Sequence, residues 1–343
     1  MTSYLRSDRS RPVAVWLFAV AFLVFAMVVI GGATRLTGSG LSITEWKPVT
    51  GAIPPLSQHA WLLEFQKYQR IPQYRFVNHG MTLDAFKGIY WWEWTHRLLG
   101  RLLGVVFAVP FIVFLALRQL TGRMIWRCLL LFFLGALQGL VGWWMVASGL
   151  EGRVSVAPER LATHLGLALI LYCALIYTGC EAWSGPGRPN YRPRWPIAAA
   201  AMAGMVYLQC LLGALVAGNQ AGLVYNDWPL MAGQMFPRAY IDGGFWRSLL
   251  HSQAAVQFNH RLGAYVLLAM AVSFAVAAVR DRTLAAPVRG LFVAMALLVC
   301  LQAGLGIGTL MMQAPLGMSA LHQAMAAIVL AVAVTLSWRS RSA

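Results

Sequence analysis

Four of the seven histidines lie toward one end of strongly apolar segments, where an imidazole needs a polar partner or a metal. A single histidine of this kind is well explained by a hydrogen bond between helices. Four at matching depth, two in each half of the chain, favour metal ligation. Imidazole nitrogen binds haem iron, and a haem takes one ligand from each of two facing helices. The candidate metal ligands pair His96 with His164 and His260 with His322.

Haem iron suits these positions better than zinc. Each half supplies two histidines, without the cysteines or carboxylates that would complete the four-coordinate shell of zinc. We therefore predict two haem sites, one in each half of the chain. The other histidines are expected to be solvated residues of outer loops: His59, His79 and His251.

One carboxylate distinguishes the two pairs. Glu93 stands three residues before His96 in WWEWTHR, whereas Gln257 precedes His260 by the same spacing. Residues three apart share a helix face, so Glu93 is predicted to point toward the edge of a haem bound by His96. A carboxylate can act as base or nucleophile or stabilise a cation, and a glutamine amide does none of these well at neutral pH. Glu93 is therefore the predicted catalytic residue, the alternative being an ordinary acid at a helix N-terminus.

An arginine follows the first histidine of each pair, as Arg97 and Arg261. Arginine binds carboxylates bidentately, so these residues could hold haem propionates. Contact with lipid headgroups is an equally good interpretation.

The chain that carries these residues is mostly apolar. Of its 343 residues, 59% are hydrophobic and 11% are charged, compared with about a quarter charged in soluble domains. Runs of about 20 apolar residues, each long enough to cross a bilayer as a helix, recur along the whole length. We predict an all-α polytopic membrane protein with eight spans, at about 13–34, 91–117, 124–147, 160–181, 194–217, 254–279, 288–312 and 316–338.

The net charge of +16 is explained by topology. With the N-terminus inside, arginines greatly outnumber acids in the inner segments, while the outer loops are nearly balanced. This positive-inside pattern places both termini in the cytoplasm and the histidines toward the outer side, without any nucleic-acid partner. The short segment before the first span lacks a transit-peptide composition, which favours a bacterial inner membrane. The inner arginines are Arg6, Arg9, Arg11, Arg118, Arg123, Arg127, Arg188, Arg192, Arg194, Arg280, Arg282, Arg289, Arg339 and Arg341.

The sequence repeats itself. GGATRLTGSGLSITEW (31–46) aligns with GALVAGNQAGLVYNDW (213–228), THRLLG (95–100) with NHRLG (259–263), and ATHLGLAL with ALHQAMAA further on. Each unit holds an even number of spans, so both enter the membrane from the same side and the repeat is parallel. We predict two tandem four-helix bundles, residues 1–181 and 182–343, related by a pseudo-twofold axis along the membrane normal.

On these motifs the chain resembles the haem A synthase family. GGATRLTGSGLS, EWTHR, ATHLG, NHRLG and LHQ follow the family's order on an eight-span frame that covers nearly the whole chain. The resemblance implies that the C8 methyl of haem O is oxidised to the formyl group of haem A for terminal oxidase biogenesis. It implies a substrate site at His96 and His164, a resident haem b at His260 and His322, and a catalytic role for Glu93.

The resemblance also implies partners: the enzyme that makes haem O, the assembling terminal oxidase and membrane lipid. The sequence leaves the number of copies open, including a homo-oligomer. Some family members carry cysteine pairs in outer loops, and this chain has none there, so a step that uses a loop disulfide is not expected. The five cysteines are expected to be small apolar packing residues: Cys128, Cys173, Cys180, Cys210 and Cys300.

Two other classes of protein remain as alternatives. A b-type cytochrome that only transfers electrons would explain the four histidines but not the difference between Glu93 and Gln257. A haem or small-molecule carrier would explain the tandem bundles without requiring ligands in both halves.

Overall fold

The described part of this computed structural model, residues 10–185 and 194–342, is helical and contains no strand. Within it, eight helices are long and apolar enough to cross a membrane, which confirms the predicted all-α fold with eight spans. Four of the predicted inner arginines, Arg6, Arg9, Arg188 and Arg192, lie outside the described residues. The eight helices are α1 (Arg11–Leu36), α4 (Leu83–Ala116), α5 (Gly122–Leu150), α6 (Pro158–Ser184), α7 (Arg194–Gly218), α9 (Gln253–Arg280), α10 (Ala286–Met311) and α11 (Leu316–Arg339).

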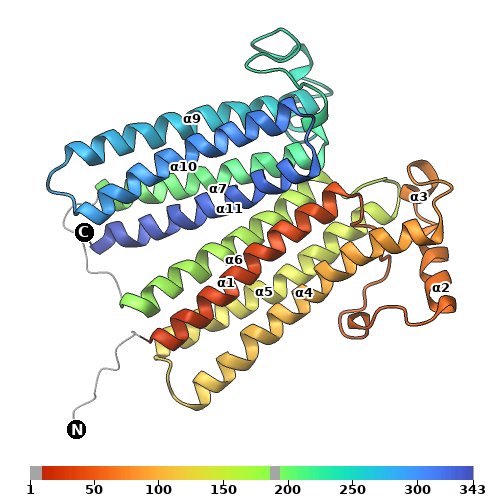
Figure 1. Cartoon of the computed structure of the whole chain (residues 1–343), viewed down its shortest axis with the longest axis horizontal. Helices are drawn as coiled ribbons and strands as arrows, with labels where there is room; N and C mark the ends of the chain where they lie inside the picture. The colour runs from red at the N-terminus through yellow and green to blue at the C-terminus, as the bar shows by residue number, and fades with distance from the viewer. Residues whose placement is uncertain (1–9, 186–193, 343) are drawn as a thin grey trace.

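The eight helices contact one another in two rings (Figure 1). One ring runs α1, α4, α5, α6 and back to α1; the other runs α7, α9, α10, α11 and back to α7. The rings meet where α6 contacts α7 and α11, and where α1 contacts α11. Helices α1 and α6 at this junction are therefore more buried than α4 and α5, which present leucine, valine and phenylalanine side chains outward. Such outward apolar faces suit a lipid environment.

Local sequence explains several of the helix starts. The hydroxyl groups of Thr82, Thr121 and Ser252 accept backbone N–H bonds in the first turns of α4, α5 and α9. These caps satisfy donors that a helix N-terminus leaves free. Helices α1, α6 and α10 instead have proline in the first turn, where its missing N–H costs nothing.

The outer segment between α1 and α4 is folded. It contains η1 (Thr50–Ala52), α2 (Gln58–Tyr68) and α3 (Pro72–Phe76), and it packs aromatic side chains with Leu41, Phe86 and Val146 over one end of α4 and α5. Helix α4 begins at Leu83, about two turns before the predicted start of this span. Asp84 and Lys87 lower the hydropathy of these first turns, so the apolar run in the sequence does not include them. Because the helix begins at Leu83, His96 lies well inside it and not at its start. In the second half, the matching connection contains η2 (Ala221–Leu223), η3 (Arg238–Tyr240) and α8 (Phe245–His251).

Two polar side chains join the two rings. Arg35, near the end of α1, donates to the carbonyl groups of Ala217 and Gly218 at the end of α7, at 3.2 and 3.4 Å. Gln323 on α11 donates to the carbonyl of Val28 on α1 at 2.7 Å. Its amide lies on the backbone of Gly32, where a Cβ would come within 1.8 Å of the amide oxygen.

We expect Gly32→Ala to lower the thermal stability of the protein. The added methyl group must expel the Gln323 amide and break its bond to Val28. A part-buried hydrogen bond of this kind contributes about 0.5–1.5 kcal/mol. Thermal unfolding in detergent measures the effect. Gly104→Ala is the matched control, since a Cβ there meets no atom of the described residues within 4 Å. Equal melting temperatures for the two variants would contradict this packing.

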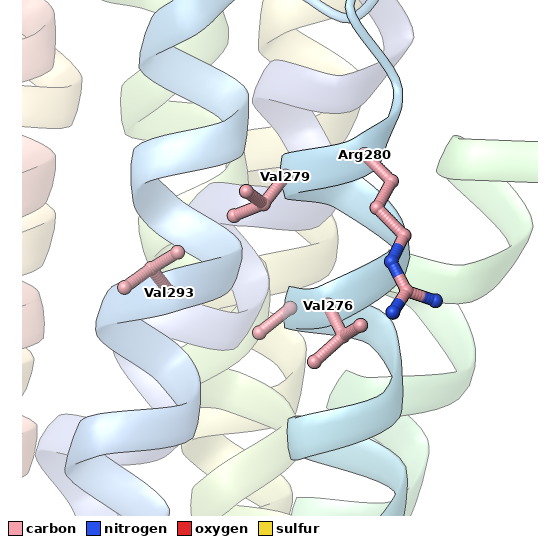
Figure 2. A pocket seen from close by; sticks show the side chains of 5 residues that line it. Val276, Val279, Arg280 and Val293 are labelled. Atoms are coloured by element: carbon pink, nitrogen blue, oxygen red, sulfur yellow. The ribbon is translucent and has the colours of Figure 1, made fainter.

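A groove of 290 Å³ lies between α9 and α10, at the ends of these helices remote from the histidines (Figure 2). Its lining is Ala275, Val276, Val279, Arg280 and Val293. Aliphatic side chains and one arginine provide no redox or nucleophilic group, so the groove is not a candidate active site.

Candidate functional site

Each of the four predicted ligand histidines packs against a glycine of a neighbouring helix. A Cβ at Gly31 on α1 would lie 2.8 Å from Cε1 of His96 on α4. The same contact joins α5 to α6, α7 to α9 and α10 to α11, with distances of 2.9, 3.2 and 2.9 Å. A larger residue at Gly31, Gly142 or Gly306 would have to displace the ring, and one at Gly213 would push it by a few tenths of an ångström, so each glycine gives its imidazole the space it occupies. The other three pairs are Gly142 with His164, Gly213 with His260, and Gly306 with His322.

The C-terminal pair has the spacing of a two-histidine metal site. The ring centroids of His260 and His322 are 6.5 Å apart and the ring planes are inclined at 86°. Imidazole nitrogen binds a first-row metal at about 2.0 Å, so two bonds plus half a ring on each side span on the order of 6 Å. One iron therefore fits between these rings.

One further observation fits a group that binds between the histidines. Nδ1 of His96 and of His322 is buried and has no hydrogen-bond partner among the described residues. Buried polar atoms are normally paired, so free ones are typical of a site that binds another group.

Three glutamines lie against the histidines, and the sequence analysis did not identify them. Nε2 of Gln138 on α5 donates to the carbonyl of His164 at 2.9 Å and lies 3.2 Å from Nδ1 of that ring. Gln209 on α7 makes the same contacts with His260, at 2.8 and 3.1 Å. Gln302 on α10 donates to the carbonyl of the α11 histidine at 3.0 Å. The signal in the sequence is a glutamine four residues before each contacting glycine.

Glu93 is buried, with 3% of its surface exposed, and its carboxylate accepts four hydrogen bonds. Oε2 accepts from the Ser42 hydroxyl and the Ile43 backbone N–H, both at 2.8 Å. Oε1 accepts from Nε and Nη2 of Arg97, at 3.0 and 2.6 Å. The carboxylate is thus fixed in position, one turn from His96, with its charge balanced by Arg97.

Further hydrogen bonds and ion pairs hold the outer segment that supplies Ser42 and Ile43. Arg97 donates to the carbonyls of Ile43 and Glu45, at 2.7 and 2.9 Å. The Glu45 carboxylate pairs with Lys47 at 2.6 Å and with Lys67 at 2.9 Å. Hydrogen bonds from these two lysines hold the pKa of Glu45 below its usual value, so the ion pairs persist at neutral pH and are lost as the pH falls through that pKa.

The second half repeats this arrangement without the carboxylate. Gln257 is also buried and donates to the carbonyls of Ala221 and Tyr225, at 2.8 and 3.2 Å. Arg261 donates to the Gln257 side chain at 3.0 Å and to the carbonyls of Tyr225 and Leu230. Both arginines therefore tie a connecting segment to its helix. Binding of haem propionates, as predicted for Arg97 and Arg261, would use donors that these bonds leave free, such as Nε of Arg261, which is buried with no partner among the described residues.

The remaining histidines lie apart from this arrangement. His59 is exposed at the start of α2, and the His79 ring contacts Tyr74. His251 approaches Glu159, with 3.9 Å between nitrogen and oxygen. The five cysteines are free within the described residues; Cys128 is buried, whereas Cys300 is exposed on α10 and is not a packing residue of the interior.

If Glu93 is the catalytic carboxylate, as the sequence predicts, Ser42→Ala is expected to slow the reaction. The variant removes one of four hydrogen bonds to the carboxylate, and a bond to a charged group contributes about 1.5–3 kcal/mol. A fall in turnover of about tenfold is expected if the bond holds the carboxylate in its reactive position. Ser57→Ala, in the same outer segment but at the start of α2, is the control. Unchanged turnover in Ser42→Ala would show that this bond does not position Glu93.

Comparison with known proteins gives a consistent match over the whole chain. Residues 14–334 match the COX15-CtaA family model, described as cytochrome oxidase assembly protein. The chain is 62% identical to the haem A synthase of Caulobacter sp. (strain K31) and 60% identical to that of Caulobacter vibrioides, over 99% of each chain. It is 49% identical to the haem A synthase of Rhodopseudomonas palustris (strain BisA53), over 94% of this chain and 90% of that one.

Proposed function

Because the chain belongs to the COX15-CtaA family of cytochrome oxidase assembly proteins, we infer that it is a haem A synthase. The enzyme oxidises haem O, converting the C8 methyl group to the formyl group of haem A. The observation that links this function to particular residues is the buried carboxylate of Glu93 beside one histidine pair. At the equivalent position beside the other pair stands Gln257, which is also buried.

We propose that the two halves hold different haems. Residues 1–181 bind haem O between His96 and His164, and residues 182–343 bind a resident haem b between His260 and His322. The repeated contacts between histidine and glycine, and the 6.5 Å separation of the C-terminal rings, support a haem at each pair, and the difference between Glu93 and Gln257 supports different roles for the two. A haem b at the second pair would supply one-electron transfer.

Glu93 is the proposed catalytic residue. Oxidation of the substrate methyl group to a formyl group removes four electrons from carbon, which must pass to an external electron acceptor, and adds one oxygen atom with loss of protons. A carboxylate near that carbon would stabilise the positive charge that develops, or would form a bond to the activated carbon that is broken when the oxygen atom is added. The carboxylate is held by hydrogen bonds from Arg97, Ser42 and Ile43. Its orientation is therefore already fixed before the substrate reacts.

The proposed setting is a bacterial inner membrane. Both termini are cytoplasmic, and the histidine pairs and the folded outer segment lie toward the periplasm, in keeping with the arginine-rich inner segments. A membrane enzyme that supplies haem O and the assembling terminal oxidase would be its functional partners.

The proposed function is tested by supplying haem O. The protein is purified from cells that make haem O, and the extracted haems are separated and identified by mass. Formation of haem A that depends on the protein is the expected result. A protein that contains only haem b and forms no haem A under these conditions would be an electron-transfer cytochrome.

A further inference from the structure

The groove between α9 and α10 opens onto the outward apolar face of the second bundle (Figure 2). Val276 and Val279 on α9 are 44% and 52% exposed, and Val293 faces them from α10. In a membrane, an apolar face of this kind is covered by acyl chains. The volume of 290 Å³ is at the lower limit of ligand pockets, about 300 Å³, which is enough for part of one acyl chain.

An arginine stands at the mouth of this groove, where α9 ends. Arg280 follows Val276 by one helical turn, so the two side chains share a face of α9. In Figure 2 the guanidinium group of Arg280 lies beside Val276. The groove therefore combines an aliphatic floor with a cation at the end of the helices remote from the histidines.

The positive charge at this end of the second bundle is not balanced by acids. The side chains of Arg280, Arg282 and Arg289 make no hydrogen bond or ion pair with another described residue. Asp281 is the only acid between positions 280 and 290, and it already pairs with Arg194. Free cations beside an apolar groove match the two parts of an anionic phospholipid, its phosphate and its acyl chain.

The first bundle differs at both parts of the groove. The offset of 164 residues that aligns THRLLG with NHRLG places Phe111 opposite Ala275. The same offset places Ala116 opposite Arg280. Phe111 is buried, and its ring centroid lies 6.2 Å from that of Phe107. A large ring thus occupies the position that Ala275 leaves open in the second bundle, and the cation is missing.

The inner arginines of the first bundle are also neutralised within the protein. Arg123 and Arg127 on α5 both pair with Glu181 on α6, which is 3% exposed. The offset of 158 residues that relates the second histidines of the two pairs places Arg339 opposite Glu181. The second bundle therefore lacks the carboxylate that balances arginine in the first.

We propose that the groove binds one anionic phospholipid, with its phosphate on Arg280 and an acyl chain against Val276, Val279 and Val293. Basic pockets between transmembrane helices on the cytoplasmic side are typical binding sites for such headgroups. The proposed topology places the groove on that side. The site belongs to the second bundle alone and does not depend on the proposed haem chemistry.

Binding of single lipids to delipidated protein tests the proposal. Purified protein in detergent is titrated with phosphatidylglycerol or phosphatidylcholine, and the bound lipid is counted by native mass spectrometry. A basic side chain near an anionic headgroup contributes a factor of about five in affinity. The first phosphatidylglycerol should therefore bind wild-type protein at least about fivefold more tightly than the first phosphatidylcholine. Arg280→Gln should lose about fivefold in affinity for phosphatidylglycerol and keep its affinity for phosphatidylcholine.

Two further variants make the test specific. Ala275→Phe should fill the groove as Phe111 does in the first bundle. It should weaken the first binding step of phosphatidylglycerol by at least about tenfold, since several methylene groups lose their contact. Arg118→Gln removes the same charge from the inner end of the first bundle and should keep the wild-type preference. Thermal unfolding checks that Ala275→Phe is folded, and Arg280→Gln decides the matter if it is not.

Three results would overturn the proposal. The first is equal affinity of wild-type protein for the two lipids, and the second is an unchanged preference in Arg280→Gln. The third is a dimer of the wild-type protein that Ala275→Phe dissociates, because a second copy of the chain would then cover the groove.

Discussion

Replacing Glu93 by glutamine is expected to stop haem A formation while leaving histidine-ligated haem in the protein. Catalysis by a positioned acid or base contributes about 10²–10⁴-fold, so turnover should fall by at least about 100-fold. Haem O or an early oxidised intermediate should accumulate. Mass analysis of the extracted haems measures the product, and the absorption spectrum of the intact protein reports the axial ligands.

The second half of the chain indicates that this variant will fold. Gln257 stands at the equivalent position, where it accepts a hydrogen bond from Arg261 at 3.0 Å and is as buried as Glu93. Glu181→Gln is a suitable control, because Glu181 is also 3% exposed and paired with arginine, on α6 but remote from the histidines. If Glu93→Gln formed haem A at the wild-type rate, Glu93 would be a structural residue that holds the outer segment and not a catalytic one.

Replacing a histidine of one pair should remove the haem of that half alone. His322→Ala is expected to lose the C-terminal haem or to convert it to a form with one axial histidine, because the alanine leaves no ligand on α11. His164→Ala should do the same in the N-terminal half. Haem content by pyridine haemochrome and the spin state of the iron measure both effects.

Added imidazole provides a second test of these variants. A free imidazole can occupy the space left by the missing ring and restore six-coordinate iron, whereas it should have no effect on a generally misfolded protein. His59→Ala, in an exposed outer position, is the control. Loss of all haem in either single variant, unrestored by imidazole, would contradict the assignment of one haem to each half.

Part of this site was predictable because its signals are local in the sequence. The apolar runs predict the helices, and the matching depth of His96, His164, His260 and His322 predicts ligation. The comparison of Glu93 with Gln257 needs only the spacing of each from the following histidine. One helix start was misplaced, since Asp84 and Lys87 make the first turns of α4 resemble a loop.

Other features depend on contacts between residues far apart in the chain. The hydrogen bond from Ser42 to Glu93 joins an outer segment to a helix, and the bond from Gln323 to Val28 joins the two halves. Neither follows from periodicity. The glutamines are an intermediate case. The spacing from Gln138 to Gly142 is visible in the sequence, but it resembles ordinary helix packing until the structure places the amide beside His164.

The central claim is that one half of the molecule transforms a haem while the other retains one. Isotopically labelled haem O supplied to wild-type protein that already contains unlabelled haem b tests it most directly. Mass analysis of bound and released haem is made over several turnovers. We predict that labelled haem A is released while the unlabelled haem b stays bound in a constant amount. Exchange of the haem b for labelled haem, or recovery of the label only as unmodified haem O, would contradict this division of roles.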